Sequence, residues 1–369
     1  MTATTAIPWW APQIGTEERE RLLRVLDSNY LNEGTVTEEF ERNAAGMFGA
    51  AHAVATTSGT SAIFLALAAL GVGHGDEVIV PDVTFIATAN AVTLTGATPV
   101  LIDVNPHTLT IDAAAVDASV TPRTRAVVPV HVSGRAAPME AILEVARRRG
   151  IAVVEDAAEA LDSRHRGRFL GTFGAAGCFS FSPNKTITTG QGGLVVTDDA
   201  SLARRLRELK DQGRPVRGTG GNDVHDVLGF NFKLTNLQAA VGVAQLDKLR
   251  SRAAHQRDLY RWYAAGLADV RQVRVLPFSV DEGETPQWVD AIAEERDALV
   301  EHLRRHDVHC RPFWFPIHTQ RPYADADARF PVSTRLMPSA LWLPSALQLT
   351  EADVLLVCDQ IRAFYRGRS

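Results

Sequence analysis

The sequence predicts an α/β fold, with a large domain built on a mainly parallel central sheet covered by helices and a smaller C-terminal α+β domain. Through the first two-thirds of the chain, short apolar runs alternate with helical segments of about ten residues. This alternation is typical of parallel strands that are buried on both faces. After about residue 197 the pattern changes to a long helical stretch at 235–267, followed by helices near 293–306 and 352–365. We therefore predict a large domain at 1–245 and a small one at 246–369.

The individual elements follow from their apolar spacing. Helices are predicted where apolar residues recur every three to four positions or form a run of ten or more residues, and strands where four to seven apolar residues stand together. The predicted helices of the large domain are 17–26, 61–70, 85–95 and 139–149. The predicted strands are 77–81, 98–104, 126–130, 151–154 and 193–197. Residues 213–222, which are rich in Gly and Arg, are predicted to form a mobile loop.

Length and composition exclude several classes of protein. The chain has 369 residues, of which 46% are hydrophobic and 22% charged, so it is neither a disordered chain nor a small disulfide scaffold. A formal net charge of -5 gives no basic footprint for nucleic acid or an anionic membrane. The longest apolar run, 62–72, is shorter than the ~20 residues that cross a bilayer. We expect a cytoplasmic protein.

The three cysteines indicate neither a disulfide framework nor a structural metal centre. Cys178, Cys310 and Cys358 are far apart and form no CxxC unit. We therefore expect no metal site.

A first candidate site is the segment Ser58-Gly59-Thr60-Ser61, which precedes an apolar helix. The first N–H groups of a helix have no partner within the helix, and hydroxyl side chains beside them add further donors. Glycine lets an anion approach the backbone closely. This combination suits a phosphate group, although a plain helix N-cap produces the same pattern.

A second candidate is the acidic pair Glu155-Asp156 at the end of the predicted strand 151–154. Ligands of open α/β sheets bind at the carboxyl ends of strands. Adjacent residues of a strand point to opposite faces, so these two carboxylates are not an acid–base pair. One is expected to contact a ligand, for which a protonated ring nitrogen would be a suitable partner, and the other to be structural. Capping of the following turn is the alternative interpretation.

Lysine is scarce in this chain. The four lysines are Lys185, Lys210, Lys233 and Lys248. Lys185 lies between two strand-like runs in a segment rich in Gly and hydroxyl residues. Lys210 and Lys248 are expected on solvated helical faces, and Lys233 has no turn residues around it. If one lysine forms a Schiff base, we expect it to be Lys185.

These features together match the needs of one cofactor. Pyridoxal 5'-phosphate requires an anchor for its phosphate, an acid for its pyridinium nitrogen and an amine for its aldehyde. The hydroxyl-rich segment, Asp156 and Lys185 would supply them. Phe85 follows a predicted strand and offers an aromatic face for the ring, although core packing is the commoner role of a Phe.

The order and spacing of the motifs resemble one family along almost the whole chain. The matching motifs are Ser58–Ala62, Gly75–Val78, Thr84–Thr88, Glu155–Ala158, Ser180–Lys185, Gly190–Gly193, Gly229–Thr235 and Arg311–His318. This pattern is similar to that of the sugar-nucleotide aminotransferases of the DegT/DnrJ/EryC1/StrS type. The resemblance implies a fold-type I, pyridoxal-phosphate-dependent enzyme that works as a homodimer.

The resemblance also implies a role for each matching residue. Lys185 would hold the cofactor as a Schiff base, Asp156 would pair with its ring nitrogen, and Phe85 would stack on the ring. Glu159 would contact the phenolic side of the cofactor. The remaining cofactor-binding residues would be Gly59, Thr60, Ser61, Ser180 and, toward the neighbouring subunit's cofactor, Asn231. The substrate cleft would be lined by Asn184, Arg311 and His318.

Some positions depart from the family pattern. Gln191 replaces the glutamate that is usual at its position in the family. Glu159 stands where Gln is common, and a glutamate at this position is similar to the perosamine-synthase branch. The segments His131–Arg135 and Gln287–Asp290 do not resemble that branch. The branch implies ping-pong transfer of an amino group from glutamate or glutamine to C4 of a 4-keto-6-deoxy sugar nucleotide, in amino-sugar biosynthesis.

Three alternatives stay open. The acceptor could be a non-nucleotide cyclic ketone of the aminocyclitol type. The protein could be a pyridoxal-phosphate sugar dehydratase, although that branch carries His in place of the Schiff-base lysine. It could also be a non-catalytic regulator that binds the cofactor.

Overall fold

A computed structural model describes residues 6–215 and 223–367, so residues 216–222 of the predicted loop lie outside it. The larger of its sheets has seven strands in the order β1-β9-β8-β5-β4-β2-β3. Strands β3, β2, β4, β5 and β8 pair in parallel, and β9 and β1 complete the edge in antiparallel pairing. The strand bounds are His52–Thr56 (β1), Glu77–Pro81 (β2), Thr98–Ile102 (β3), Thr124–Val127 (β4), Ala152–Asp156 (β5), Ala176–Ser180 (β8) and Gly193–Thr197 (β9). The predicted mainly parallel sheet is confirmed.

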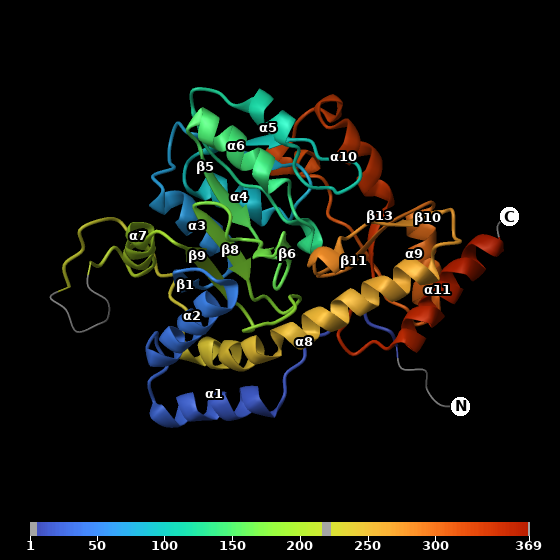
Figure 1. Cartoon of the computed structure of the whole chain (residues 1–369), viewed down its shortest axis with the longest axis horizontal. Coiled ribbons are helices and arrows are strands. Elements are labelled where there is room, and N and C mark those ends of the chain that lie inside the picture. The colour runs from blue at the N-terminus through green and yellow to red at the C-terminus, as the bar shows by residue number, and fades with distance from the viewer. Residues whose placement is uncertain (1–5, 216–222, 368–369) are drawn as a thin grey trace.

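Helices cover both faces of this sheet because its strands are apolar on both sides (Figure 1). Within β9, for example, Val195 packs toward one face, whereas Leu194 and Val196 pack toward the other. The first face carries α3 (Gly59–Ala69), α4 (Ala87–Leu94) and α7 (Ala200–Lys210). The second carries α2 (Thr35–Phe48), α5 (Ala113–Ser119), α6 (Met139–Arg149) and the start of α8.

The long helix α8 (Asn236–Gly266) leads from the large sheet to the C-terminal elements (Figure 1). It begins at the N-cap Thr235, whose hydroxyl accepts the N–H of Gln238. Near its start it packs against α1 (Thr16–Ser28) and α2, and near its end against α11. The domain boundary predicted after residue 245 falls inside this helix, and the division into two domains stays a prediction.

A second, four-stranded antiparallel sheet follows α8, in the order β10-β11-β13-β12. Its strands are Val273–Val275 (β10), Val289–Ala293 (β11), Arg311–Pro312 (β12) and Ala340–Leu343 (β13). Helices α9 (Arg296–Arg305) and α11 (Glu351–Arg366) pack together with it, and α10 (Pro331–Leu336) lies before β13. A short hairpin, β6 (Arg164–His165) and β7 (Arg168–Phe169), completes the strands of the described residues. Two of these strands, β10 and β12, have only three and two residues, which explains their weak sequence signal.

The prediction that Lys210 lies on a solvated helical face is wrong. Its side chain is buried, and its amine lies 2.6 Å from Oε1 of Glu33, 3.1 Å from Oε1 of Glu41 and 2.9 Å from the carbonyl oxygen of Ala55. The arginines around it in the sequence suggested a surface, but the last turn of α7 faces α2 and β1.

None of the helices in the ranges that the structure covers is long and apolar enough to span a membrane.

Candidate active site

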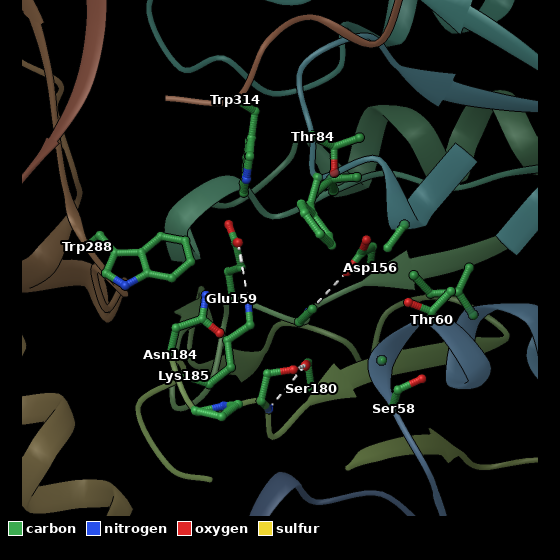
Figure 2. A pocket seen from close by; sticks show the side chains of 18 of the residues that line it. Ser58, Thr60, Thr84, Asp156, Glu159, Ser180, Asn184, Lys185, Trp288 and Trp314 are labelled. Atoms are coloured by element: carbon green, nitrogen blue, oxygen red, sulfur yellow. Dashed lines mark hydrogen bonds and ion pairs between the residues drawn. The ribbon is translucent and has the colours of Figure 1, made fainter. Parts of the chain in front are cut away.

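A cavity of about 390 Å³ lies at the carboxyl end of β5, between the start of α3, the loop that joins β8 to β9, and the second sheet (Figure 2). Most of the residues predicted from the sequence line this one cavity. They are Gly59, Thr60, Phe85, Asp156, Glu159, Ser180, Asn184, Lys185 and Arg311. The fold thus gathers residues as far apart in the chain as Gly59 and Arg311.

Lys185 lies in the loop between β8 and β9, and its side chain is 8% exposed. Its amine lies 3.2 Å from Oε1 of Glu159 and 5.0 Å from the centre of the Trp288 ring. Figure 2 shows this amine pointing away from the hydroxyl groups at the start of α3 and toward Glu159. A buried primary amine that opens into a cavity is a candidate nucleophile for a carbonyl group.

Asp156 is the last residue of β5, and its carboxylate faces the cavity. Oδ2 accepts the hydroxyl of Thr88 at 2.7 Å, and Oδ1 accepts the N–H of Ala158 at 3.1 Å. Burial raises the pKa of Asp156, and the bonds to Thr88 and Ala158 and the charge of Lys185 oppose that rise. A buried carboxylate of this kind is stabilised when a cation binds beside it.

Glu155 points to the other side of the strand, as predicted. Its Oε2 lies 2.9 Å from Nε2 of His131 and accepts the N–H of Gly171 at 2.8 Å, and its Oε1 accepts the N–H of Gly174 at 2.6 Å. Glu155 is completely buried and does not line the cavity. Its carboxylate is therefore structural and fixes the loop that precedes β8.

Glu159 is the second buried carboxylate of the cavity. Oε2 accepts the backbone N–H of Ser133 at 2.9 Å, while Oε1 meets the amine of Lys185. Burial raises the pKa of Glu159, and the Lys185 ammonium opposes that rise. The carboxylate is thus held at one oxygen and directed at the lysine with the other.

The start of α3 forms the hydroxyl-rich part of the cavity. Ser58 is the N-cap, and its Oγ accepts the N–H of Ser61. The hydroxyl of Ser61 in turn accepts the N–H of Ser58, so the two residues form a capping box, and Ser61 does not line the cavity. The predicted role of Ser61 in binding the cofactor stays a prediction. A Cβ on Gly59 would lie 2.9 Å from the Cβ of Ser180, so glycine lets the helix start approach the end of β8.

His318 does not line the cavity, contrary to the prediction. It is 1% exposed, its Nδ1 lies 2.7 Å from Oδ2 of Asp82, and its backbone N–H donates to Oδ1 of Asp82 at 2.8 Å. Asp82 directly follows β2, so this pair fastens the turn at Ile317–Thr319 to the large sheet. The family resemblance implied that His318 shares a substrate cleft with Arg311, but the chain turns at Ile317–Thr319, between β12 and α10.

Asn231 is exposed and bridges to Asp211 outside the cavity. Its predicted role concerns the cofactor of a second copy of the chain, and that role stays a prediction.

An aromatic wall is the part of the site that the sequence did not reveal. Trp288, Trp314 and Trp342 line the cavity. Trp288 and Trp342 lie 4.9 Å apart between ring centres, and Trp9 packs on both from behind. The guanidinium of Arg311 lies 4.9 Å from the centre of the Trp9 ring. The only available signal was the rarity of tryptophan, which occurs six times in the chain.

The residues present fit pyridoxal phosphate. The cavity offers one buried amine, one buried carboxylate at a strand end, and helix-start N–H groups with hydroxyls where glycine keeps the backbone open. These are the groups that the aldehyde, the ring nitrogen and the phosphate of the cofactor require.

Comparison with known proteins gives a consistent result. The model of the DegT/DnrJ/EryC1/StrS aminotransferase family matches residues 12–362. The chain is 39% identical over 363 residues to GDP-perosamine synthase of Caulobacter vibrioides, covering 95% of this chain and 97% of the relative. It is 36% identical to GDP-perosamine synthase of Escherichia coli O157:H7 over 367 residues, covering 98% and 99%.

A solved structure agrees with these relatives. DesV of S. venezuelae, crystallised in complex with a ketimine intermediate, superposes with a TM-score of 0.92 at 34% identity, covering 98% of this chain and 99% of that one. The predicted fold-type I architecture is confirmed by this likeness. The chain belongs to the DegT/DnrJ/EryC1/StrS family and is a pyridoxal-phosphate-dependent sugar aminotransferase.

Proposed function

We propose that this enzyme transfers an amino group from glutamate to C4 of a 4-keto-6-deoxy sugar nucleotide. The observation that carries the proposal is the convergence of Lys185, Glu159 and Asp156 in one buried cavity beside the start of α3. The choice of acceptor is supported by the two relatives named GDP-perosamine synthase and by the carboxylate, rather than an amide, at position 159.

The cofactor, when bound, supplies an electron sink for the carbon that loses a proton. In the proposal, Lys185 holds it, and Asp156 keeps its ring nitrogen protonated. The start of α3, with Gly59 and Thr60, and the hydroxyl of Ser180 bind its phosphate. In the donor half-reaction, the free Lys185 amine would take the proton from the α-carbon of glutamate and deliver it to C4′ of the cofactor, so that the donor leaves as its keto acid and its nitrogen stays behind. Glu159, whose Oε1 lies 3.2 Å from this amine, would stabilise the ammonium that the proton creates.

The acceptor would lie against the aromatic wall. Tryptophan rings offer flat apolar surfaces on which the C–H face of a sugar ring can pack. Arg311, beside this wall, would attract the anionic diphosphate of a nucleotide. The proposal includes a homodimer in which Asn231 of each chain reaches the other chain's cofactor.

The test uses the complete chain loaded with pyridoxal phosphate. Glutamate should convert the visible absorbance to that of the pyridoxamine form, and glutamine is the alternative donor to compare. The amine-loaded enzyme is then offered 4-keto-6-deoxy sugars carrying GDP, TDP or UDP, together with a cyclic ketone of the cyclitol type. Mass spectrometry detects the amine, and NMR of the product locates it. Amination of the cyclitol ketone alone, or at a carbon other than C4, would contradict the proposal.

A further inference from the structure

The segment Gln287–Asp290, at the start of β11, reaches from the second sheet to the loop that carries Lys185. The side chain of Gln287 bonds the peptide groups on both sides of that lysine. Its Oε1 accepts the N–H of Thr186 at 3.3 Å, and its Nε2 donates to the carbonyl oxygen of Asn184 at 3.2 Å. Gln287 is 1% exposed, so these bonds lie in the protein interior.

Gln287 is itself held firmly through its own backbone. Its N–H donates to the carbonyl oxygen of Ser133 at 2.7 Å, and its carbonyl oxygen accepts Nε2 of Gln256, on α8, at 3.0 Å. Both partners belong to other parts of the fold. The amide of Gln287 therefore has one defined place, and so do the two peptide groups that it bonds.

Asp290 is connected to Lys185 by a second route, a chain of hydrogen bonds through Ser133 and Glu159. Its Oδ1 accepts the hydroxyl of Ser133 at 2.8 Å, and its Oδ2 lies 3.0 Å from Nη2 of Arg135. The backbone N–H of Ser133 in turn donates to Glu159, whose other oxygen meets Lys185. Asp290, Ser133 and Glu159 are all buried.

Ser133 connects the two ends of this second route. It has a left-handed backbone, with φ at 53°, which L-residues adopt only when their surroundings hold them there. The hydroxyl bond to Asp290 is one such restraint, because it ties the turn at Val132–Gly134 to the second sheet. Release of that bond would free the N–H that orients Glu159.

We propose that Gln287 and Asp290 are positioning residues that set where the Lys185 amine stands, Gln287 through the flanking peptide groups and Asp290 through Ser133 and Glu159. Neither side chain touches the amine. A lysine side chain has four rotatable carbon–carbon bonds and loses rotamer entropy when it is fixed, so neighbouring groups are needed to hold its tip. The inference rests on the pyridoxal-phosphate-dependent activity and not on the identity of the acceptor.

The test compares Gln287→Leu and Asp290→Ala with Glu284→Ala. Glu284 is a matched control, because it is buried and also joins the segment before β11 to the chain that follows the turn at Val132–Gly134. Its carboxylate accepts the N–H groups of Ala136 at 2.8 Å and Ser279 at 2.7 Å. The first measurement, made without any acceptor, is the pH at which the visible band of each pyridoxal-phosphate-loaded protein changes. The second is the kcat and KM of the glutamate half-reaction.

In Gln287→Leu and Asp290→Ala we expect the spectral midpoint to fall by about one pH unit, because the Glu159 carboxylate no longer stands beside the nitrogen of Lys185. We expect kcat to fall at least ~10-fold with KM for glutamate nearly unchanged, because a displaced amine loses reactivity rather than substrate binding. Asp290→Asn, which can still accept the Ser133 hydroxyl, should recover most of the midpoint. Glu284→Ala should leave the midpoint unchanged.

An unchanged midpoint in folded Gln287→Leu and Asp290→Ala would overturn the inference, and so would an equal shift in Glu284→Ala. If Asp290→Ala does not fold, Ser133→Ala removes the same bond to Asp290 and decides the second route by the same measurements. These outcomes are independent of the acceptor screen, so failure of the C4 proposal and failure of this inference can be told apart.

Discussion

The amine of Lys185 lies 3.2 Å from a carboxylate oxygen of Glu159, and both side chains are buried. Opposite charges at this distance stabilise each other strongly where water is excluded. In the proposed reaction, Lys185 alternates between a bonded state and a free amine that carries a proton. Glu159 gives the free, protonated state a defined partner, which keeps the amine at the reacting atoms through both halves of the cycle.

Replacement of the nucleophile gives the first prediction. Lys185→Ala should lose the visible band of the lysine-bound cofactor and lower kcat by at least ~10²-fold, because the variant lacks both the attachment point and the proton-carrying amine. Absorbance spectra and amination rates check this. Lys248→Ala is the control, since Lys248 pairs with Glu17 and Glu18 between α8 and α1 and does not line the cavity. Retention of full activity by Lys185→Ala would show that another amine does the chemistry.

The second prediction concerns the start of α3. Gly59→Ala places a Cβ 2.9 Å from the Cβ of Ser180. The helix start and β8 must then separate, so the dissociation constant for pyridoxal phosphate should rise about tenfold, which corresponds to ~1.4 kcal/mol. Gly46→Ala is the matched control, because a Cβ at this helical position of α2 meets nothing within 4 Å. Its cofactor affinity should not change, and its stability should rise by about 0.5–1 kcal/mol. Titration of the apoprotein with cofactor measures both affinities, and equal affinities for Gly59→Ala and the native chain would contradict the prediction.

The buried lysine of α7 gives a prediction about stability. Lys210→Met removes the cation that the buried carboxylates of Glu33 and Glu41 share. We expect the free energy of unfolding in urea to fall by about 3–5 kcal/mol. The triple change Lys210→Met, Glu33→Gln and Glu41→Gln should recover part of this loss, because it removes the buried charges together. A loss below about 1 kcal/mol in Lys210→Met would mean that water reaches the pair.

The ion pair between Glu18 of α1 and Lys248 of α8 predicts that the free energy of unfolding depends on pH. Burial opposes ionisation of Glu18, but bonds from Lys248, Gln245 and the N–H of Gly15 outweigh it and lower its pKa to about 2. Because this pKa lies below the ordinary value of 4.5, Glu18 stabilises the folded state above about pH 4.5, and that contribution is lost as the pH falls toward 2. Glu18→Gln should therefore cost about 2 kcal/mol at pH 7 and less at pH 3, as measured by urea unfolding. Glu17→Gln, at an exposed position, should change little at either pH, and an equal cost of Glu18→Gln at the two values would contradict this account.

The sequence was sufficient for the features that depend on short stretches of chain. The apolar runs predicted the strands β2, β3, β5 and β9. The long helical stretch predicted at 235–267 matches the bounds of α8 to within one residue at each end. The alternation along β5 correctly placed Asp156 and Glu155 on opposite faces. Lys185 could be selected because the chain has only four lysines and one lies in a loop of Gly and hydroxyl residues. These inferences succeed because backbone geometry over a few residues sets the periodicity.

What required the tertiary structure was every relationship between distant segments. Lys210 and His318 are buried because α7 turns toward α2, and because the turn at Ile317–Thr319 docks on Asp82, which no local pattern records. The tryptophan wall and the frame of Gln287 and Asp290 around Lys185 likewise join the second sheet to the first. By itself the sequence determined the elements and the chemical groups. Only packing of the two sheets decided which groups share a dry cavity, because burial and hydrogen-bond satisfaction depend on neighbours that the local chain does not supply.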